Sequence, residues 1–190
     1  MPDRRFVIDT SLFVNPHARE KFGKDPTEAV RGFIALVDGL DVHFYMPPSV
    51  FGELKNFVKS DAMEELELVL NKRAPNVYGI FLPAAVLYEF IEDMRGRINK
   101  GLRLAEDFAK DNQPDNDEKL RKLREKYRDV MRAEIIDSKE DFELVLLAKE
   151  LDATLVSSDE GAIKFANQIG CTWINASKFH SILNKIGKNR

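Results

Sequence analysis

Two aspartates stand four residues apart where an apolar helix is predicted to begin, in the segment Ile136-Asp137-Ser138-Lys139-Glu140-Asp141-Phe142. On a helix, residues at this spacing share one face, so the carboxylates of Asp137 and Asp141 would lie one turn apart and repel each other. The positive end of the helix dipole offsets part of that repulsion. A solvated helix start is the simpler explanation of the pair taken alone. A functional site therefore needs support from elsewhere in the chain.

That support comes from two further aspartates, each placed just after a predicted strand. Asp9 follows the short apolar run Phe6-Val7-Ile8, and Asp159 follows the run 153–156 after two serines. A single aspartate in such a place is more often a turn or cap residue than a ligand. In open α/β sheets, however, sites form where the carboxyl ends of parallel strands meet. Right-handed crossovers would bring Asp9, Asp137, Asp141 and Asp159 to one end of the sheet.

Four converging carboxylates point to metal chemistry. In a partly buried cleft their mutual repulsion would cost several kcal/mol unless a cation neutralised it. Ligands that are all oxygen atoms suit Mg²⁺ or Mn²⁺ better than Zn²⁺. Such ions generate hydroxide from bound water and stabilise the leaving oxygen of an in-line displacement at phosphorus. Other chemistries lack support, because the three histidines have no triad context and the glycines form no phosphate-binding loop.

The elements that must position these acids follow an alternating pattern. Strands are predicted at 6–8, 42–46, 153–156 and 171–174, and helices at 28–37 (capped by Thr27), 50–58, 61–72, 138–151 and 162–169, with a last helix capped by Ser177. Strands that alternate with helices indicate an α/β fold, in which a parallel sheet is covered on both faces.

A different pattern interrupts this domain. Apolar residues keep helical spacing over 84–110 and again over 118–134, with a polar turn between the two runs. Two long helices joined by a short loop form an antiparallel hairpin. We therefore expect residues 1–83 and 134–190 to form one domain and residues 84–133 to form an inserted arm. The apolar stripes of this arm would not be fully buried within one hairpin, which favours pairing with another arm.

Composition narrows the class of protein. Of the 190 residues, 44% are hydrophobic and 32% are charged, and the net charge of −3 excludes a uniformly basic nucleic-acid binder. The single cysteine, Cys171, excludes a disulfide framework and indicates a reducing compartment. Neither a signal-peptide apolar region nor a membrane-spanning run is recognisable. We expect a soluble cytoplasmic protein.

The arm nevertheless carries local basic runs. A solvated helix surface would explain them, but beside a metal site that acts on phosphate esters phosphate binding is the better explanation, since lysine and arginine contacts give affinity without reading sequence. The candidate phosphate contacts, which would be RNA contacts if the substrate is RNA, are Arg95, Arg97, Lys100, Arg103, Lys119, Arg121, Lys122, Arg124 and Arg128.

Three segments together resemble the acid motifs of PIN-domain ribonucleases: Phe6-Val-Ile-Asp-Thr-Ser11, the helix with Asp137 and Asp141, and Val156-Ser-Ser-Asp-Glu-Gly161. A narrower resemblance covers nearly the whole chain. Four runs are similar to the small protein-only RNase P family known as HARP, the homologues of Aquifex RNase P: Tyr88-Glu-Phe-Ile-Glu92, Arg97-Ile-Asn-Lys-Gly-Leu-Arg103, Leu123-Arg-Glu-Lys-Tyr-Arg128 and Asp137-Ser-Lys-Glu-Asp141.

This resemblance implies a PIN-like three-layer fold and metal-dependent endonucleolytic removal of the 5′ leader from precursor tRNA by an activated water, without an RNA subunit. It implies that the four aspartates bind Mg²⁺ or Mn²⁺. The residues expected to support these ligands are Thr10, Ser11, Glu53, Ser138 and Ser158, although capping alone would explain Ser138 and a solvated helix surface would explain Glu53. Glu143 is expected to point away from the acid face. The family also implies dimers that pair through the arm and assemble into a homododecamer.

Three alternatives remain open at this point. Another PIN endoribonuclease, of the toxin type or acting in RNA decay, would share the acids, but a toxin needs no basic arm. A non-catalytic RNA-binding assembly protein would gain nothing from four mutually repelling carboxylates. A structural protein with a coiled arm would leave the acids unexplained.

Overall fold

The computed structural model describes residues 4–110, 116–132 and 138–188. These residues divide into two compact units. The first contains residues 4–81 and 138–188, and the second contains residues 82–110 and 116–132. We describe each unit by itself.

The first unit is built on a five-stranded parallel sheet with strand order β3-β2-β1-β4-β5. The strands are β1 (Arg5–Ile8), β2 (His43–Met46), β3 (Leu70–Lys72), β4 (Thr154–Ser157) and β5 (Trp173–Asn175). β1 lies at the centre, with Ile8 opposite Val156 of β4. Since all strands run in the same direction, the chain leaves every strand at one common edge of the sheet, its carboxyl edge.

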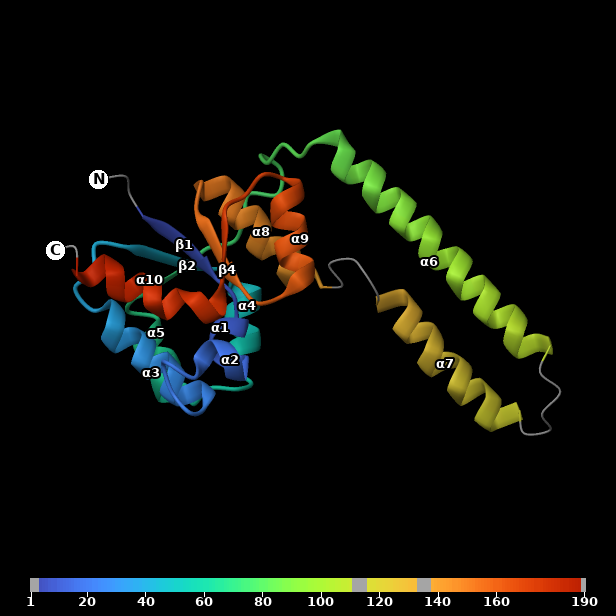
Figure 1. The fold of residues 1–190 in the computed structure, drawn as a ribbon, viewed down its shortest axis with the longest axis horizontal. Helices are drawn as coiled ribbons and strands as arrows, with labels where there is room; N and C mark the ends of the chain where they lie inside the picture. Colours follow the sequence, from blue (N-terminus) through green and yellow to red (C-terminus); the bar gives the residue numbers. More distant parts are fainter. Residues whose placement is uncertain (1–3, 111–115, 133–137, 189–190) are drawn as a thin grey trace. The chain divides into compact units, whose positions relative to one another are not determined.

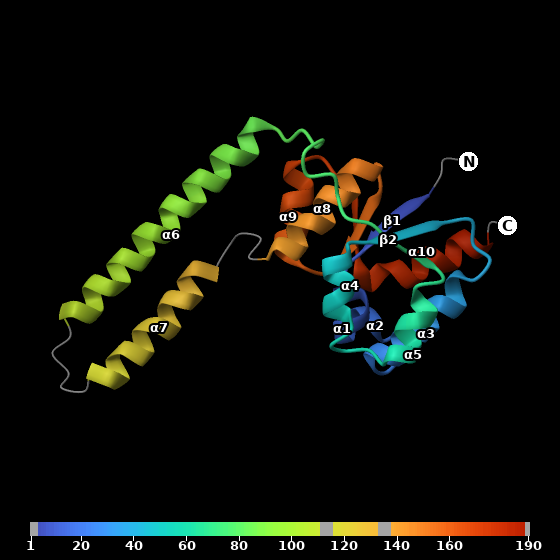
Figure 2. The same cartoon turned by 180° about the vertical axis from the view of Figure 1, so that it is seen from behind.

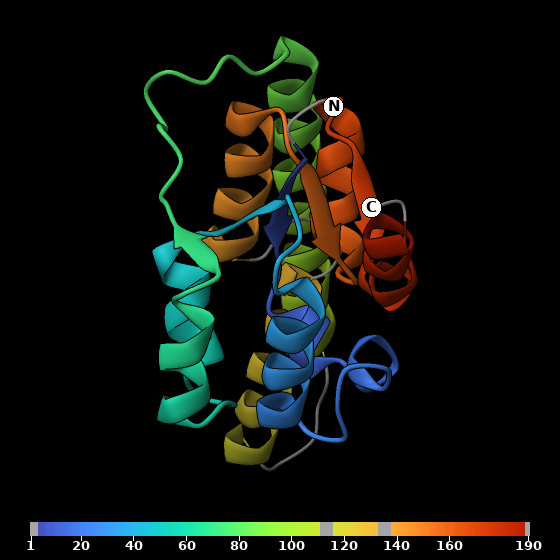
Figure 3. The ribbon, with the colours of Figure 1, turned by 90° about the vertical axis from the view of Figure 1, so that its left-hand side faces the viewer.

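Helices cover both faces of this sheet (Figures 1 and 2). On one face, α8 (Lys139–Leu151) packs on β1 and β4, α9 (Glu160–Gln168) packs on β4 and β5, and α4 (Pro48–Leu54) contacts α8. On the other face, α10 (Ala176–Lys188) packs on β4 and β5 and contacts α3 (Pro26–Val37). The same layer contains α1 (Ser11–Val14), α2 (Pro16–Arg19) and α5 (Ser60–Leu66), as Figure 3 shows from the side. The predicted three-layer α/β fold is confirmed.

An aromatic cluster fills the layer between the sheet and α3 and α10. The ring of Phe179 lies 5.0 Å from that of Phe6, and the ring of Phe33 lies 5.1 Å from that of Phe44, both edge to face. Phe33 and Phe179 are fully buried. Such pairs add about 0.5–1.5 kcal/mol each to the free energy of area burial, so this cluster fixes the sheet on which the candidate site is built.

The predicted helix over 61–72 is wrong in its second half. α5 ends at Leu66, and Leu70–Lys72 form β3, in register with Phe44, Tyr45 and Met46 of β2. Helical spacing of apolar residues continues through this segment, but pairing with the open edge of β2 satisfies its backbone groups instead. The start of α3 also differs, because Asp25 caps this helix through the amide of Glu28 and Pro26 occupies its first turn.

The second unit is a helical hairpin of α6 (Ala84–Lys110) and α7 (Asn116–Arg132). With 27 residues, α6 is roughly 40 Å long. Gly101 lets the two helices approach closely, since a Cβ atom there would lie 2.7 Å from Cε2 of Tyr127. None of the helices in the described parts of the chain combines the length and apolar character needed to cross a membrane.

Candidate active site

Asp9 is the centre of a hydrogen-bond network at the carboxyl edge of the sheet. Its side chain is only 4% exposed, and one carboxylate oxygen, Oδ2, accepts hydrogen bonds from the hydroxyls of Ser11 and Ser157, each at 2.6 Å. The other oxygen, Oδ1, accepts from the Thr10 hydroxyl at 3.2 Å. A buried carboxylate requires such donors, because leaving it without them would cost several kcal/mol. The expectation that Thr10 and Ser11 support Asp9 agrees with this geometry.

Ser157 connects Asp9 to Asp159. Its side chain is fully buried, and its hydroxyl donates to Asp9 while it accepts from the backbone N–H of Asp159 at 2.9 Å. Ser11 forms a parallel link, since it accepts from the backbone N–H of Ser158 at 2.9 Å. These two serines tie the end of β1 to the end of β4, which fixes the relative positions of two of the predicted ligands.

Sequence reasoning missed Ser157 and selected its neighbour Ser158. The strand register would have identified it. Ile8 pairs with Val156, so Asp9 and Ser157 occupy the next row and point to the same side of the sheet. This inference needs the pairing of two strands that are almost 150 residues apart in the sequence.

Asp159 is exposed and caps α9, with its Oδ1 accepting from the backbone N–H of Ala162 at 2.7 Å. Asp141 stands in the first turn of α8, where its Oδ2 accepts from the Ser138 hydroxyl at 2.8 Å and its backbone N–H donates to the same hydroxyl oxygen at 3.0 Å. Ser138 therefore caps the helix and orients the Asp141 carboxylate at the same time. Asp137 lies outside the described residues.

The ionisation of Glu53 is influenced by the acids of this site. Partial burial raises the pKa of its carboxyl, and the negative charges of Asp9 and Glu140 raise it further. Glu53 on α4 is thus coupled by charge to Asp9, which follows β1, and to Glu140 on α8, which the sequence did not single out. A bound cation would reverse this effect, because a positive charge favours the ionised carboxylate.

Glu143 has a structural role. It lies one turn beyond Glu140 on α8, accepts a 2.5 Å hydrogen bond from the Ser49 hydroxyl on α4, and pairs with Lys139 at 3.2 Å. Its contacts therefore hold α4 against α8.

The residues present fit a hard divalent cation by their chemistry. Asp9, Asp141 and Asp159 each have at least one carboxylate oxygen held by a hydroxyl or amide donor, which is how outer contacts orient metal ligands. Within residues 4–110, 116–132 and 138–188, however, no three His, Cys, Asp or Glu side chains lie close enough together to hold a metal ion. The four-carboxylate metal site therefore stays a prediction.

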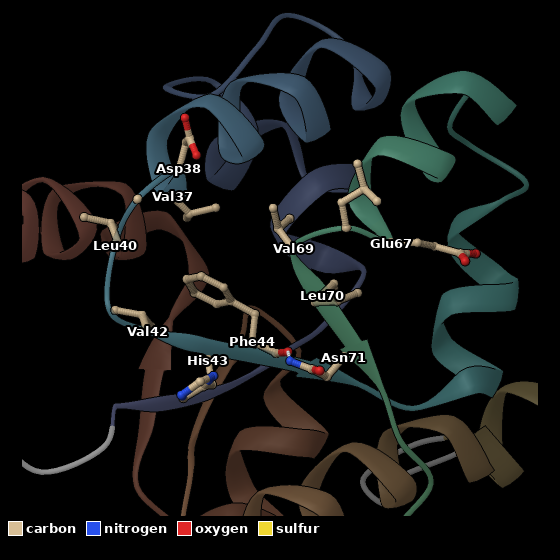
Figure 4. Close-up of a pocket in the computed structure, with 12 residues that line it drawn as sticks. Val37, Asp38, Leu40, Val42, His43, Phe44, Glu67, Val69, Leu70 and Asn71 are labelled. Carbon is tan, nitrogen blue, oxygen red and sulfur yellow. Dashed lines mark hydrogen bonds between the residues drawn. The ribbon is translucent and has the colours of Figure 1, made fainter.

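A pocket elsewhere in this unit does not belong to the acid site. Its volume is about 310 Å³, and its lining includes His43, Phe44, Leu70 and Asn71, the first residues of β2 and β3 (Figure 4). These residues mark the amino edge of the sheet, whereas Asp9 lies at the carboxyl edge. Among the described residues, no aspartate of the candidate site lines this pocket.

On the arm, most of the candidate RNA contacts are accessible. The exposed ones are Arg95, Lys100, Arg103, Arg121, Lys122, Arg124 and Arg128, and Lys119 is half-buried. Arg97, by contrast, is only 8% exposed. Lys122 pairs with Glu118 at 2.8 Å, and Arg95 pairs with Glu92 at 3.1 Å.

The arm also exposes large apolar side chains. On α6, Leu87, Ile98 and Leu102 are 57–58% exposed, and on α7, Leu120 and Tyr127 are 49% and 44% exposed. A hairpin that leaves this much apolar surface in water offers an association surface.

A parallel sheet with acidic residues at the carboxyl ends of β1 and β4 and at the start of α8 defines a nuclease of the PIN class. The family model for a PINc domain ribonuclease matches residues 5–188. Proteins named RNA-free ribonuclease P are similar over almost their whole length. The relative from Thermococcus onnurineus is 50% identical over 94% of this chain and 93% of its own.

The relative from Pyrococcus furiosus is 46% identical over 96% of this chain and 94% of its own length. The relative from Thermodesulfovibrio yellowstonii is 42% identical over 95% of this chain and 93% of its own length. The chain belongs to the RNA-free ribonuclease P family.

We expect Ser157→Ala to impair cleavage of RNA more than it impairs folding. The change removes a buried donor to Asp9 and the acceptor for the Asp159 amide, which should lower the free energy of unfolding by about 1–3 kcal/mol. Loss of a group that orients a metal ligand typically costs about 10–100-fold in activity or metal affinity. Thermal unfolding and the Mg²⁺ concentration that gives half-maximal cleavage measure the two effects.

Ser49→Ala is the matched control, because it also removes a serine hydroxyl bonded to a carboxylate, that of Glu143. It should reduce stability without changing the Mg²⁺ requirement. Equal Mg²⁺ requirements for the two variants would show that Ser157 does not orient the ligands.

Proposed function

We propose that this protein is an RNA-free ribonuclease P, which removes the 5′ leader of precursor tRNA by metal-dependent hydrolysis. The observation that carries this proposal is the extent of the identity. The relatives match 94–96% of the chain, so the likeness includes the arm as well as the acid-bearing sheet unit. A toxin or an RNA-decay enzyme that shared only the PIN unit would not account for this.

The chemistry proposed is an in-line displacement at phosphorus. Bound Mg²⁺ or Mn²⁺ would lower the pKa of a water molecule and stabilise the leaving oxygen. Asp9, Asp137, Asp141 and Asp159 would hold the ion, with Thr10, Ser11 and Ser157 orienting the carboxylate of Asp9 and Ser138 that of Asp141. Water adds to the phosphorus, and the bond to the 3′ oxygen of the leader breaks. The products are a leader with a 3′ hydroxyl and a tRNA with a 5′ phosphate.

We further propose that the arm binds the tRNA part of the precursor and joins copies of the chain. Exposed arginines and lysines on α6 and α7 support phosphate binding, which suits a folded RNA because its A-form grooves offer little base readout. The exposed apolar side chains of α6 and α7 support pairing of arms from two copies. By family resemblance, such dimers would assemble into a homododecamer. We propose a cytoplasmic location, where precursor tRNA is processed.

The test is a cleavage assay mapped to the nucleotide. The purified protein with Mg²⁺, and without any RNA subunit, should cut precursor tRNA once, at the boundary between leader and mature 5′ end. Added chelator should abolish the cut, and Mg²⁺ or Mn²⁺ should restore it.

Cuts at scattered single-stranded sites would instead identify an RNA-decay enzyme. Tight binding of precursor without any cleavage would identify a non-catalytic assembly protein, and either result would overturn the proposal.

A further inference from the structure

Two lysines of the sheet unit lie against one aromatic ring. The ammonium of Lys72, the last residue of β3, lies 4.8 Å from the centre of the Phe51 ring, and that of Lys55 lies 5.5 Å from it. The two ammonium groups are therefore no more than about 10 Å apart. The Phe51 ring is buried, while both lysines are exposed. The ring thus holds two like charges at the surface.

The strand register places this pair at the edge of the sheet that carries the acids. Lys72 pairs with Met46 of β2, and Val7 of β1 pairs with the residue before Met46, so Lys72, Met46 and Ile8 share one row. Asp9 follows Ile8 directly after β1, at the same edge, with its side chain on the opposite face of the sheet from this row. With neighbouring strands spaced about 4.8 Å apart, β3 lies about 10 Å from β1. α4 contributes to both groups, since the charge of Asp9 raises the pKa of Glu53 and the Phe51 ring contacts the lysines.

The fold gains little from this arrangement. Exposed cation–π contacts contribute little, and two cations on one ring repel each other. Lys72 also pairs with Glu67 at 2.7 Å, but this ion pair is well exposed and therefore weak. In the described part of the chain no ion pair involves Lys55. Lys72 thus lies at the same edge of the sheet as Asp9, and no ion pair within the described residues offsets the charge of Lys55.

An exposed aromatic side chain lies near Lys55 in the sequence. Phe57 follows Lys55 by two residues and is 48% exposed. Proteins that bind single-stranded nucleic acid combine basic side chains, which follow the phosphates, with aromatic rings on which bases stack. Lys55, Lys72 and Phe57 provide both kinds of contact.

We propose that Lys55 and Lys72 bind phosphates of the single-stranded 5′ leader and so position the precursor for cleavage. This inference rests on the proposed function. The leader is the single-stranded part of the substrate that must lie next to the scissile phosphate, and therefore near the carboxyl edge that holds Asp9. The folded body of the precursor, in contrast, is the part that the basic arm can bind.

The experiment compares two precursors of one tRNA, with a single-nucleotide leader and with a leader of about eight nucleotides. For the intact protein the long leader should lower KM. The double variant Lys55→Ala/Lys72→Ala should raise KM for the long-leader precursor by about tenfold, to the value for the short leader, because phosphate contacts are lost. Cleavage of the short-leader precursor and the cleavage position should not change.

The control variant is Lys185→Ala/Lys188→Ala, which removes the same charge from the far end of α10, near Leu40 and the amino edge. It should leave both KM values unchanged. Lys55→Arg/Lys72→Arg keeps both charges and should keep the lower KM for the long-leader precursor. This result would show that the alanine variant loses phosphate contacts and not its fold. An equal rise of KM for both precursors would assign the lysines to the tRNA body, and unchanged KM values would remove them from the substrate surface.

Binding of a leader-length oligoribonucleotide, measured by fluorescence anisotropy, separates this inference from the proposed function. Weaker binding by the alanine variant than by the intact protein supports the single-strand site even if precursor tRNA is not the substrate. Equal binding by both proteins would overturn the inference.

Discussion

Asp141→Asn is expected to reduce the rate of leader removal by at least about 100–1,000-fold, while the affinity for precursor tRNA changes by less than about twofold. The substitution keeps the shape of the side chain but removes the charge that a divalent cation needs. The hydrogen bond from the backbone N–H of Asp141 to the Ser138 hydroxyl, which caps α8, does not depend on this charge. Single-turnover cleavage at saturating protein, together with a filter-binding curve, measures the two quantities.

Asp152→Asn provides the matched control, because it makes the same chemical change at the opposite end of α8. Asp152 has a left-handed backbone conformation (φ 49°) that asparagine also adopts readily. This control should cleave at the normal rate. If Asp141→Asn retained more than about a tenth of the activity, Asp141 would not be a metal ligand in the reaction.

Arg124→Ala/Arg128→Ala is expected to weaken precursor binding by about 10–100-fold at moderate salt. Both side chains are exposed and lie four residues apart on one flank of α7. Because each arginine would neutralise a phosphate, the slope of log affinity against log salt concentration should become shallower by roughly 2. A salt series of binding curves tests both statements, and the mass of the protein in solution, measured by light scattering, should not change.

Lys122→Ala/Lys126→Ala is the charge-matched control on the same helix. Lys122 pairs with Glu118, and Lys126 lies 5.5 Å from the centre of the Phe108 ring, so these lysines are already engaged within the arm. Their loss should weaken binding less. If all variants and the intact protein bound alike across the salt series, the arm would have no part in holding the substrate.

The acid motifs could be predicted because their signals are local. A short apolar run that ends in aspartate, as at Ile8-Asp9, indicates the exit of a strand, and parallel strands all exit at one edge. The bounds predicted for α6 agree with the structure because a long helix repeats its apolar period many times. Short elements give fewer repeats, so the three residues of β3 carry no period of their own and the pattern predicts a helix there.

The supporting contacts could not be predicted in the same way. Ser157 differs from Ser158 only in which side of the strand it occupies, and that choice depends on the register between β1 and β4. The proximity of Glu53 to Asp9 and Glu140 depends on how α4 packs beside α8. The burial of Arg97 among mostly exposed basic residues of the arm is likewise decided by packing.

The sequence by itself thus determined the class of fold, the aspartates at the strand ends and the helical arm, because periodicity and strand ends are properties of neighbouring residues. Only the tertiary structure decided that Ser157 joins Asp9 to Asp159 and that Lys55 and Lys72 meet on the Phe51 ring. Those contacts join residues from different elements, and the packing free energy of the whole unit selects them.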